Sequence, residues 1–123
     1  MFTKSPEDIF TEVLAGMAEG GRTIPTRKFA KVPHTGYVVA TSGITMYGNT
    51  ADLDRAIEFI KSEHKAVYYQ VNGYFSVWVD QDTRIVYLDR VQIFSELATA
   101  LEVAHKHSQL AIYDLSEQQE IRV

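Results

Sequence analysis

The sequence predicts an α+β fold in which three helices pack on a mainly antiparallel sheet of about four to six strands. Three segments repeat apolar side chains at helical spacing, and short runs rich in Val, Ile, Tyr, Phe and Trp lie among them. Turn signals at 72–73 and 81–83 join β-rich runs that are too close together for a helical connection. The chain of 123 residues is long enough to bury a core, and no repeat, linker or low-complexity segment divides it.

The first helix is predicted to begin after Ser5 and to end at the glycines at 20 and 21. Ser5 is a favourable N-cap, and Pro6 suits the first helical position. One apolar face follows, formed by Ile9, Phe10, Val13, Leu14 and Met17. We therefore expect a single domain, 1–123, made of an N-terminal helix at 1–20 and an α+β body at 21–123.

The next elements alternate between strand and helix. Thr23-Ile24 is compatible with a short edge strand, and 37–41 reads as a strand between two glycines. Residues 44–48 fit either a further strand or a loop. A second helix is predicted from Asn49 or Thr50 to the neighbourhood of His64.

A meander of three strands is predicted next, at 66–71, 74–80 and 84–90. Asn72-Gly73 is a strong signal for a two-residue hairpin turn, because both residues tolerate positive φ. A third helix beginning at Ser95-Glu96, a strand at 110–115 and a closing strand at 120–123 complete the order. We expect the three helices to cover one face of the sheet.

The composition narrows the cellular setting. The chain contains no cysteine, which excludes disulfides and thiolate metal sites and suits a reducing compartment. No apolar run approaches the length of a bilayer span, and the N-terminus carries acids where a signal peptide carries a positive charge. We therefore expect a cytoplasmic protein with no membrane contact.

The net charge of −4 conceals a local excess of positive charge. Residues 20–50 carry four cations and no acid, whereas the rest of the chain carries −8. The overall sign disfavours general nucleic-acid binding, but the basic segment could hold phosphate or a carboxylate-rich surface. Its members are Arg22, Arg27, Lys28 and Lys31; the alternative is a solvated loop.

Aromatic residues point to a second candidate surface. Side chains alternate between the two faces of a strand, so Tyr74, Ser76 and Trp78 share one face and Phe75, Val77 and Val79 share the other. In the next strand, Tyr87 and Asp89 lie opposite Val86, Leu88 and Arg90. Tyr, Trp and Arg are typical of binding hot spots, although tyrosines can also simply cover the second face of a sheet. The predicted binding residues are Arg22, Arg27, Lys28, Lys31, Tyr74, Trp78, Tyr87 and Arg90.

No motif for catalysis, nucleotide binding or metal binding is present. His105 and His107 fall on a predicted helix, where positions two apart point away from each other. Asp80, Asp82 and Asp89 cluster around a predicted turn, where aspartate commonly makes local hydrogen bonds. We therefore predict no cofactor, no metal and no catalytic residue, and we lean away from an enzyme.

Several segments together resemble an uncharacterised small domain found in proteins of phages and other mobile elements. The segments are Gly20-Gly21-Arg22-Thr23-Ile24, Pro33-His34-Thr35-Gly36-Tyr37-Val38-Val39, Trp78-Val79-Asp80, Val86-Tyr87-Leu88-Asp89, Gln109-Leu110-Ala111-Ile112-Tyr113-Asp114-Leu115 and Glu120-Ile121. The similarity covers roughly residues 20–123 and departs at Gln81-Asp82-Thr83-Arg84, where that domain tends to carry a glycine. It implies an origin in a phage or mobile element and brings no functional residues with it.

The sequence favours a non-enzymatic binding protein, with counter-defence inhibition as the role that this origin suggests. The partner would be a host protein or protein complex in the host cytoplasm, or a nucleotide-like anion; a homo-oligomer is compatible with the sequence. The alternative is an accessory interaction module, related to domains of larger phage polyproteins, without activity of its own. An enzyme with a site outside the known motifs comes last.

Overall fold

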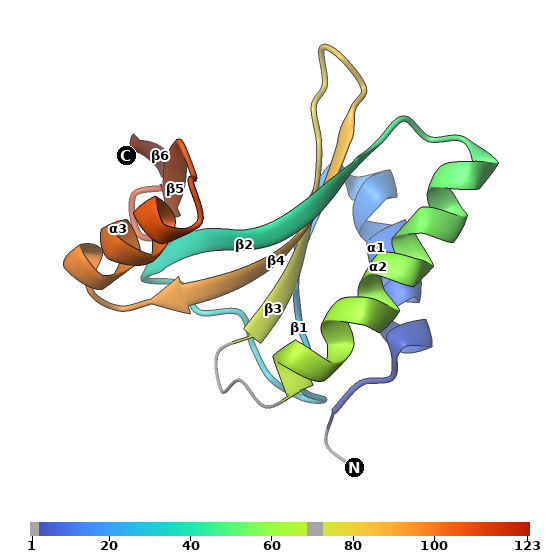
Figure 1. Ribbon diagram of the computed structural model, residues 1–123, viewed down its shortest axis with the longest axis horizontal. Helices are drawn as coiled ribbons and strands as arrows, with labels where there is room; N and C mark the ends of the chain where they lie inside the picture. The colour runs from blue at the N-terminus through green and yellow to red at the C-terminus, as the bar shows by residue number, and fades with distance from the viewer. Residues whose placement is uncertain (1–2, 69–72) are drawn as a thin grey trace.

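The computed structural model describes residues 3–68 and 73–123, which form three helices and one six-stranded sheet (Figure 1). The elements in chain order are α1 (Pro6–Glu19), β1 (Gly21–Pro25), β2 (Tyr37–Met46), α2 (Thr50–Tyr68), β3 (Gly73–Val79), β4 (Val86–Phe94), α3 (Leu97–Lys106), β5 (Ala111–Asp114) and β6 (Gln119–Arg122). The strands lie in the order β1-β3-β4-β2-β5-β6, and each neighbouring pair is antiparallel. The predicted fold class is confirmed.

Local signals place the first helix as predicted. The Ser5 hydroxyl accepts a hydrogen bond from the Asp8 amide at 3.1 Å, and Pro6 is the first helical residue. Gly20 ends the helix with a φ of 96°, a conformation that costs glycine little. The chain turns directly into β1, which is an edge strand of the sheet, in agreement with the short edge strand predicted there.

The prediction of a strand at 66–71 is wrong where the structure describes it. α2 continues through residue 68, one turn beyond the predicted end, and the rest of the predicted strand, with Asn72, lies outside the described residues. No glycine or proline interrupts the chain between 50 and 72, so nothing local stops the helix at His64. The hairpin predicted around 81–83 is confirmed by the pairing of β3 with β4.

Because of a bulge at Thr41, apolar side chains from both halves of β2 point to the same face of the sheet. Val39 pairs with Gln92 and Ile44 with Leu88, but the register shifts between Ala40 and Ser42. In a regular strand, positions 39 and 44 would point to opposite faces. The extra residue brings both side chains to the face that carries the helices.

Two apolar clusters lie under the helices, so the expectation that all three cover one face is confirmed by the register. The larger cluster joins α1 and α2 to the sheet, and its fully buried members include Ile9, Ile24, Ile60, Phe75 and Leu88. The smaller cluster joins α3 to β2 and β5 through Val39, Ala100, Ala104 and Ile112, and Ile121 of β6 packs against it.

A polar network separates these two clusters on the same face. Arg90 donates to Glu63 of α2 at 2.8 Å and to the Thr41 hydroxyl at 3.0 Å. The Ser42 hydroxyl donates to the second Glu63 oxygen at 3.0 Å. Each partner is thus satisfied in a partly buried position, and the bulge supplies two of the polar groups.

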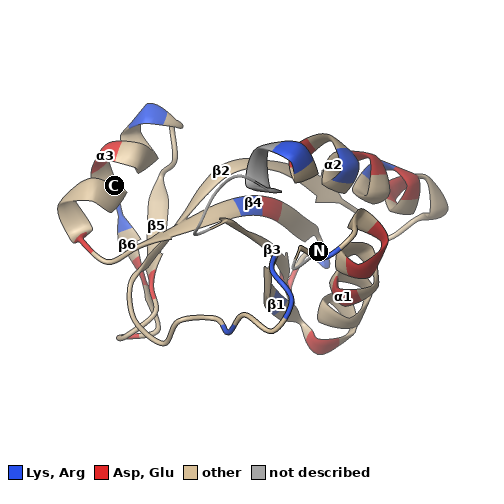
Figure 2. Cartoon of the chain, turned by 90° about the horizontal axis from the view of Figure 1, so that it is seen from below, with Lys and Arg blue, Asp and Glu red and all other residues tan. Residues whose placement is uncertain are grey.

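The other face of the sheet carries no helix. The segment between β1 and β2 crosses on that side, from β1 to the far part of the sheet (Figure 2). Its ends are held by hydrogen bonds, from the Thr26 hydroxyl to the Gly73 carbonyl at 3.0 Å and from the Leu115 amide to the Gly36 carbonyl at 2.9 Å. None of the helices in the described residues has both the length and the apolar character needed to cross a bilayer.

Candidate functional site

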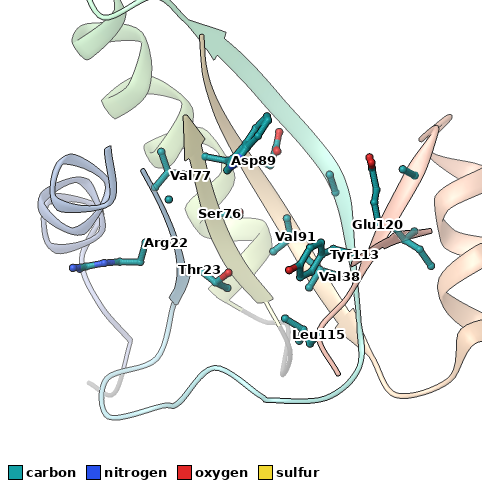
Figure 3. Close-up of a pocket in the computed structure, with 15 residues that line it drawn as sticks. Arg22, Thr23, Val38, Ser76, Val77, Asp89, Val91, Tyr113, Leu115 and Glu120 are labelled. Carbon is teal, nitrogen blue, oxygen red and sulfur yellow. The ribbon is translucent and has the colours of Figure 1, made fainter. Parts of the chain in front are cut away.

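The helix-free face contains a hollow of about 670 Å³, which we call the sheet pocket (Figure 3). β1, β3, β4, β2, β5 and β6 all contribute to it, so it spans the width of the sheet. Its lining is mostly apolar and comprises Gly21, Arg22, Thr23, Val38, Ala40, Ser76, Val77, Trp78, Asp89, Val91, Ala111, Ile112, Tyr113, Leu115 and Glu120. A volume of this size falls within the range of small-molecule sites.

Asp89 places a carboxyl group in the middle of this apolar lining. It lies within β4, opposite Ser76 of β3 on one side and Gly43 of β2 on the other. Among the described residues its carboxylate has no hydrogen-bond or ion-pair partner. Burial without a compensating partner disfavours the charged form and raises the pKa of Asp89 from 3.8 to about 6.

The Asp89 carboxylate occupies the space that a side chain at position 43 would need, and Gly43 has none. A Cβ atom at Gly43 would lie 1.9 Å from the Oδ1 atom of Asp89 and 3.1 Å from the Leu88 carbonyl oxygen. No side chain therefore fits here without moving the carboxylate. The glycine in the centre of the sheet and the acid beside it form one unit.

An aromatic pair lies next to the carboxylate. Trp78 and Tyr87 are cross-strand partners whose stacked rings have centroids 5.5 Å apart and planes inclined by 27°. Trp78 lines the sheet pocket and is 53% exposed. The predicted face of Tyr74, Trp78 and Tyr87 is confirmed by the register, although Tyr74 and Tyr87 lie outside the pocket lining.

Two of the predicted binding residues direct their charge elsewhere. Arg22 forms a close ion pair with Glu19 and lies 3.9 Å from Glu12, both on α1, and Figure 3 shows its side chain leaving the pocket. Arg90 belongs to the opposite face, where it pairs with Glu63. The structure does not bring these guanidinium groups together with the aromatic side chains.

The other three predicted cations lie on the crossing segment. Arg27, Lys28 and Lys31 are exposed, and Lys28 lines a separate hollow beside Asp8 and Glu12 of α1. Between them Phe29 is 93% exposed with a φ of 65°, a strained conformation for a residue with a side chain. These residues are accessible but are not part of the pocket lining.

The remaining candidates occupy local structural positions. His105 lies in the last turn of α3 and His107 is its C-cap, as expected for a helical pair. Asp80 accepts hydrogen bonds from the amides of Asp82 and Thr83, which is the turn role predicted for it. Within residues 3–68 and 73–123, no group of three or more potential ligands is arranged to hold a metal ion.

The predicted binding residues do not include Asp89, because Asp80 and Asp82 nearby in the sequence point to a turn. The signal was present, since alternation from Tyr87 places Asp89 on the same face as Val91 and Ile93, inside a strand. Tyr113 and Glu120 were missed for another reason. They reach the pocket only because β5 pairs with β2, and no local pattern sets that pairing.

Comparison of the chain with protein-family models, with curated proteins and with solved structures finds no match.

Proposed function

We propose that this chain is a non-enzymatic binding protein that holds a small molecule in the sheet pocket. The observation that carries the proposal is the hollow itself, about 670 Å³ on the helix-free face, where the Asp89 carboxylate has no partner among the described residues and lies among apolar and aromatic side chains. Ligand sites combine these features, a mostly apolar concavity and a few polar groups that orient the ligand.

The environment of Asp89 supports binding more than catalysis. A carboxyl group with a raised pKa in a pocket is a candidate general base, but a reaction usually needs a second positioned group. Among the described residues, no histidine, nucleophile or second acid makes a hydrogen bond with the Asp89 side chain. Binding requires no such partner.

Of the two counter-defence mechanisms that the resemblance suggests, this proposal favours sequestration of a small molecule over binding of a host protein. A chain that holds a small molecule would act by sequestration, and a molecule belonging to a host defence system would then be withdrawn from it. Inhibition through direct binding of a host protein would instead use the exposed surface around the crossing segment.

A fragment screen followed by amide chemical shifts tests the proposal. We expect small aromatic fragments to shift amides of β2, β4 and β5 around the sheet pocket. Ala40→Leu fills part of the lining and should abolish these shifts. Ala98→Leu adds the same atoms at an exposed position of α3 and should leave them unchanged. Shifts that are absent, or that persist in Ala40→Leu, would refute a ligand site here.

Trp78→Ala gives a second test of the same surface. Because the Trp78 side chain is 53% exposed, we expect its loss to cost much less stability than the about 3–5 kcal/mol typical of a buried tryptophan. Binding of the fragments should weaken more than folding does. Thermal melts and fragment titrations of the same sample compare the two effects, with the core variant Leu88→Ala as the destabilised reference.

A further inference from the structure

The charged groups that a ligand in the sheet pocket can reach are negative. Asp89 has no partner among the described residues, and Glu120 on β6 adds a second, exposed carboxylate at the rim. Arg22, the cation in the lining, is turned toward Glu19 and Glu12 on α1. A cationic group entering the pocket would therefore meet an uncompensated negative charge, whereas an anion would meet repulsion.

Trp78 strengthens the preference for a cation. Ser76 is the cross-strand partner of Asp89, and Trp78 is the next residue of β3 on the same face. Such diagonal neighbours lie about 7–8 Å apart, which is the separation that a compact cation and its carbon body can bridge. The face of an indole attracts cations, and the stacked Tyr87 holds the ring in place.

The lining beyond these two residues suits an apolar body. Val38, Ala40 and Val91 form the floor, and Tyr113 lies beside its cross-strand partner Val38 (Figure 3). Ser76, the cross-strand partner of Asp89, adds a hydroxyl near the carboxylate, and Thr23 adds another farther along the lining. The pocket thus pairs one negative group with a surface for carbon atoms.

We infer that the sheet pocket binds a small organic cation, an amine on an aromatic or apolar body, with the ammonium group against Asp89 and the body against Trp78 and the apolar floor. This inference rests on the proposed function and names its ligand class. It also selects against the nucleotide-like anion that the basic segment suggested, at least within this pocket.

Three probes of matched shape test the inference: phenethylamine, its neutral analogue 2-phenylethanol and the anion 3-phenylpropionate. Trp78 is the single tryptophan of the chain and lines the pocket, so its emission reports binding directly. We expect phenethylamine to bind at least about tenfold more tightly than 2-phenylethanol, because hydrogen bonds to charged groups contribute more than neutral ones. The anion should bind most weakly.

Asp89→Asn separates the charge from the shape. The variant should lose at least about tenfold in affinity for phenethylamine and should change little for 2-phenylethanol. Asp82→Asn is the matched control, since it removes the same charge from an exposed position in the same hairpin and should leave both affinities unchanged.

Four outcomes would overturn the inference: no binding of phenethylamine, equal binding of the neutral probe, an unchanged affinity in Asp89→Asn, or tighter binding of a blocked Gly-Lys-Gly peptide than of the amine. The last would assign the pocket to a protein side chain. None of them decides the proposed function, because the fragment screen with Ala40→Leu tests the pocket whatever the charge of its ligand.

Discussion

A charge held in the lining of the sheet pocket has a cost in stability that depends on pH. Because burial raises the pKa of Asp89 to about 6, the folded chain binds the proton more tightly than the unfolded chain does. The contribution of Asp89 to stability is therefore fully present below about pH 3.8 and is lost as the pH rises through about 6.

Replacing Asp89 with Asn removes this dependence. At pH 8 we expect Asp89→Asn to be more stable than the natural chain by up to about 3 kcal/mol, and at pH 3.5 the two should be nearly equal. Urea denaturation of both proteins across this range measures the difference. A variant that is equally or less stable at pH 8 would show that the carboxylate is already solvated or paired.

Gly43 and Asp89 should be energetically coupled. Gly43→Ala places a methyl group 1.9 Å from Oδ1 of Asp89, so we expect a loss of about 1–3 kcal/mol from the displaced side chain. In an Asp89→Ala background most of this clash disappears, and the cost should fall by at least about 0.5 kcal/mol. A double-mutant cycle from chemical denaturation measures the coupling, and equal costs in the two backgrounds would exclude it.

At the scale of the element, α1 approaches the sheet closely at Gly16. A Cβ atom there would lie 2.5 Å from Cγ1 of Val77 and 2.9 Å from Cβ of Arg22. Alanine normally stabilises a helix by about 1 kcal/mol relative to glycine, but here we expect Gly16→Ala to destabilise by about 1–3 kcal/mol. Combining it with Val77→Ala should recover part of the loss in a thermal melt; a stabilising single variant would contradict the close packing.

The elements that carry local signals could be predicted from the sequence. Ser5 and Gly20 mark both ends of α1, and Gln81-Asp82-Thr83 marks the β3–β4 turn. The end of α2 could not, because residues 66–68 favour strands by composition and are helical by continuation of a helix that nothing interrupts.

The sheet pocket could be predicted only in part. Alternation along β3 and β4 places Trp78 and Asp89 on the helix-free face. The hollow itself depends on the pairing of β5 with β2, which brings Tyr113 and Glu120 from the end of the chain. Such long-range pairings are set by tertiary packing, which leaves no local signature.

At the scale of the molecule, the cations of the crossing segment lie outside the lining of the sheet pocket, whose acids are Asp89 and Glu120. Arg27 and Lys28 are exposed, so we expect Arg27→Ala/Lys28→Ala to change stability by less than about 0.5 kcal/mol. Affinity for phenethylamine should rise by up to about threefold at low salt and return to the natural value as salt screens the charges.

The anion site predicted from the sequence gives the opposite result for the same double variant. If Arg27 and Lys28 bind an anionic partner, 3-phenylpropionate or inorganic phosphate should bind the natural chain at low salt and should be lost in the variant. Titration with both anions separates the two views, and equal affinities in the natural chain and the variant would remove these residues from an anion site.

The polar network at Arg90 divides the packing of the molecule into two units, and the sheet pocket has one wall in each. Trp78 and Asp89 belong to the strands of the larger cluster, whereas Tyr113 and Glu120 belong to the hairpin that packs with α3. Units with separate cores unfold locally with different free energies, and amide hydrogen exchange measures each of them. A molecule that contacts both walls binds only when both units are folded. Its binding should therefore couple them, so that amides of the hairpin and of the central strands exchange with the same free energy of opening.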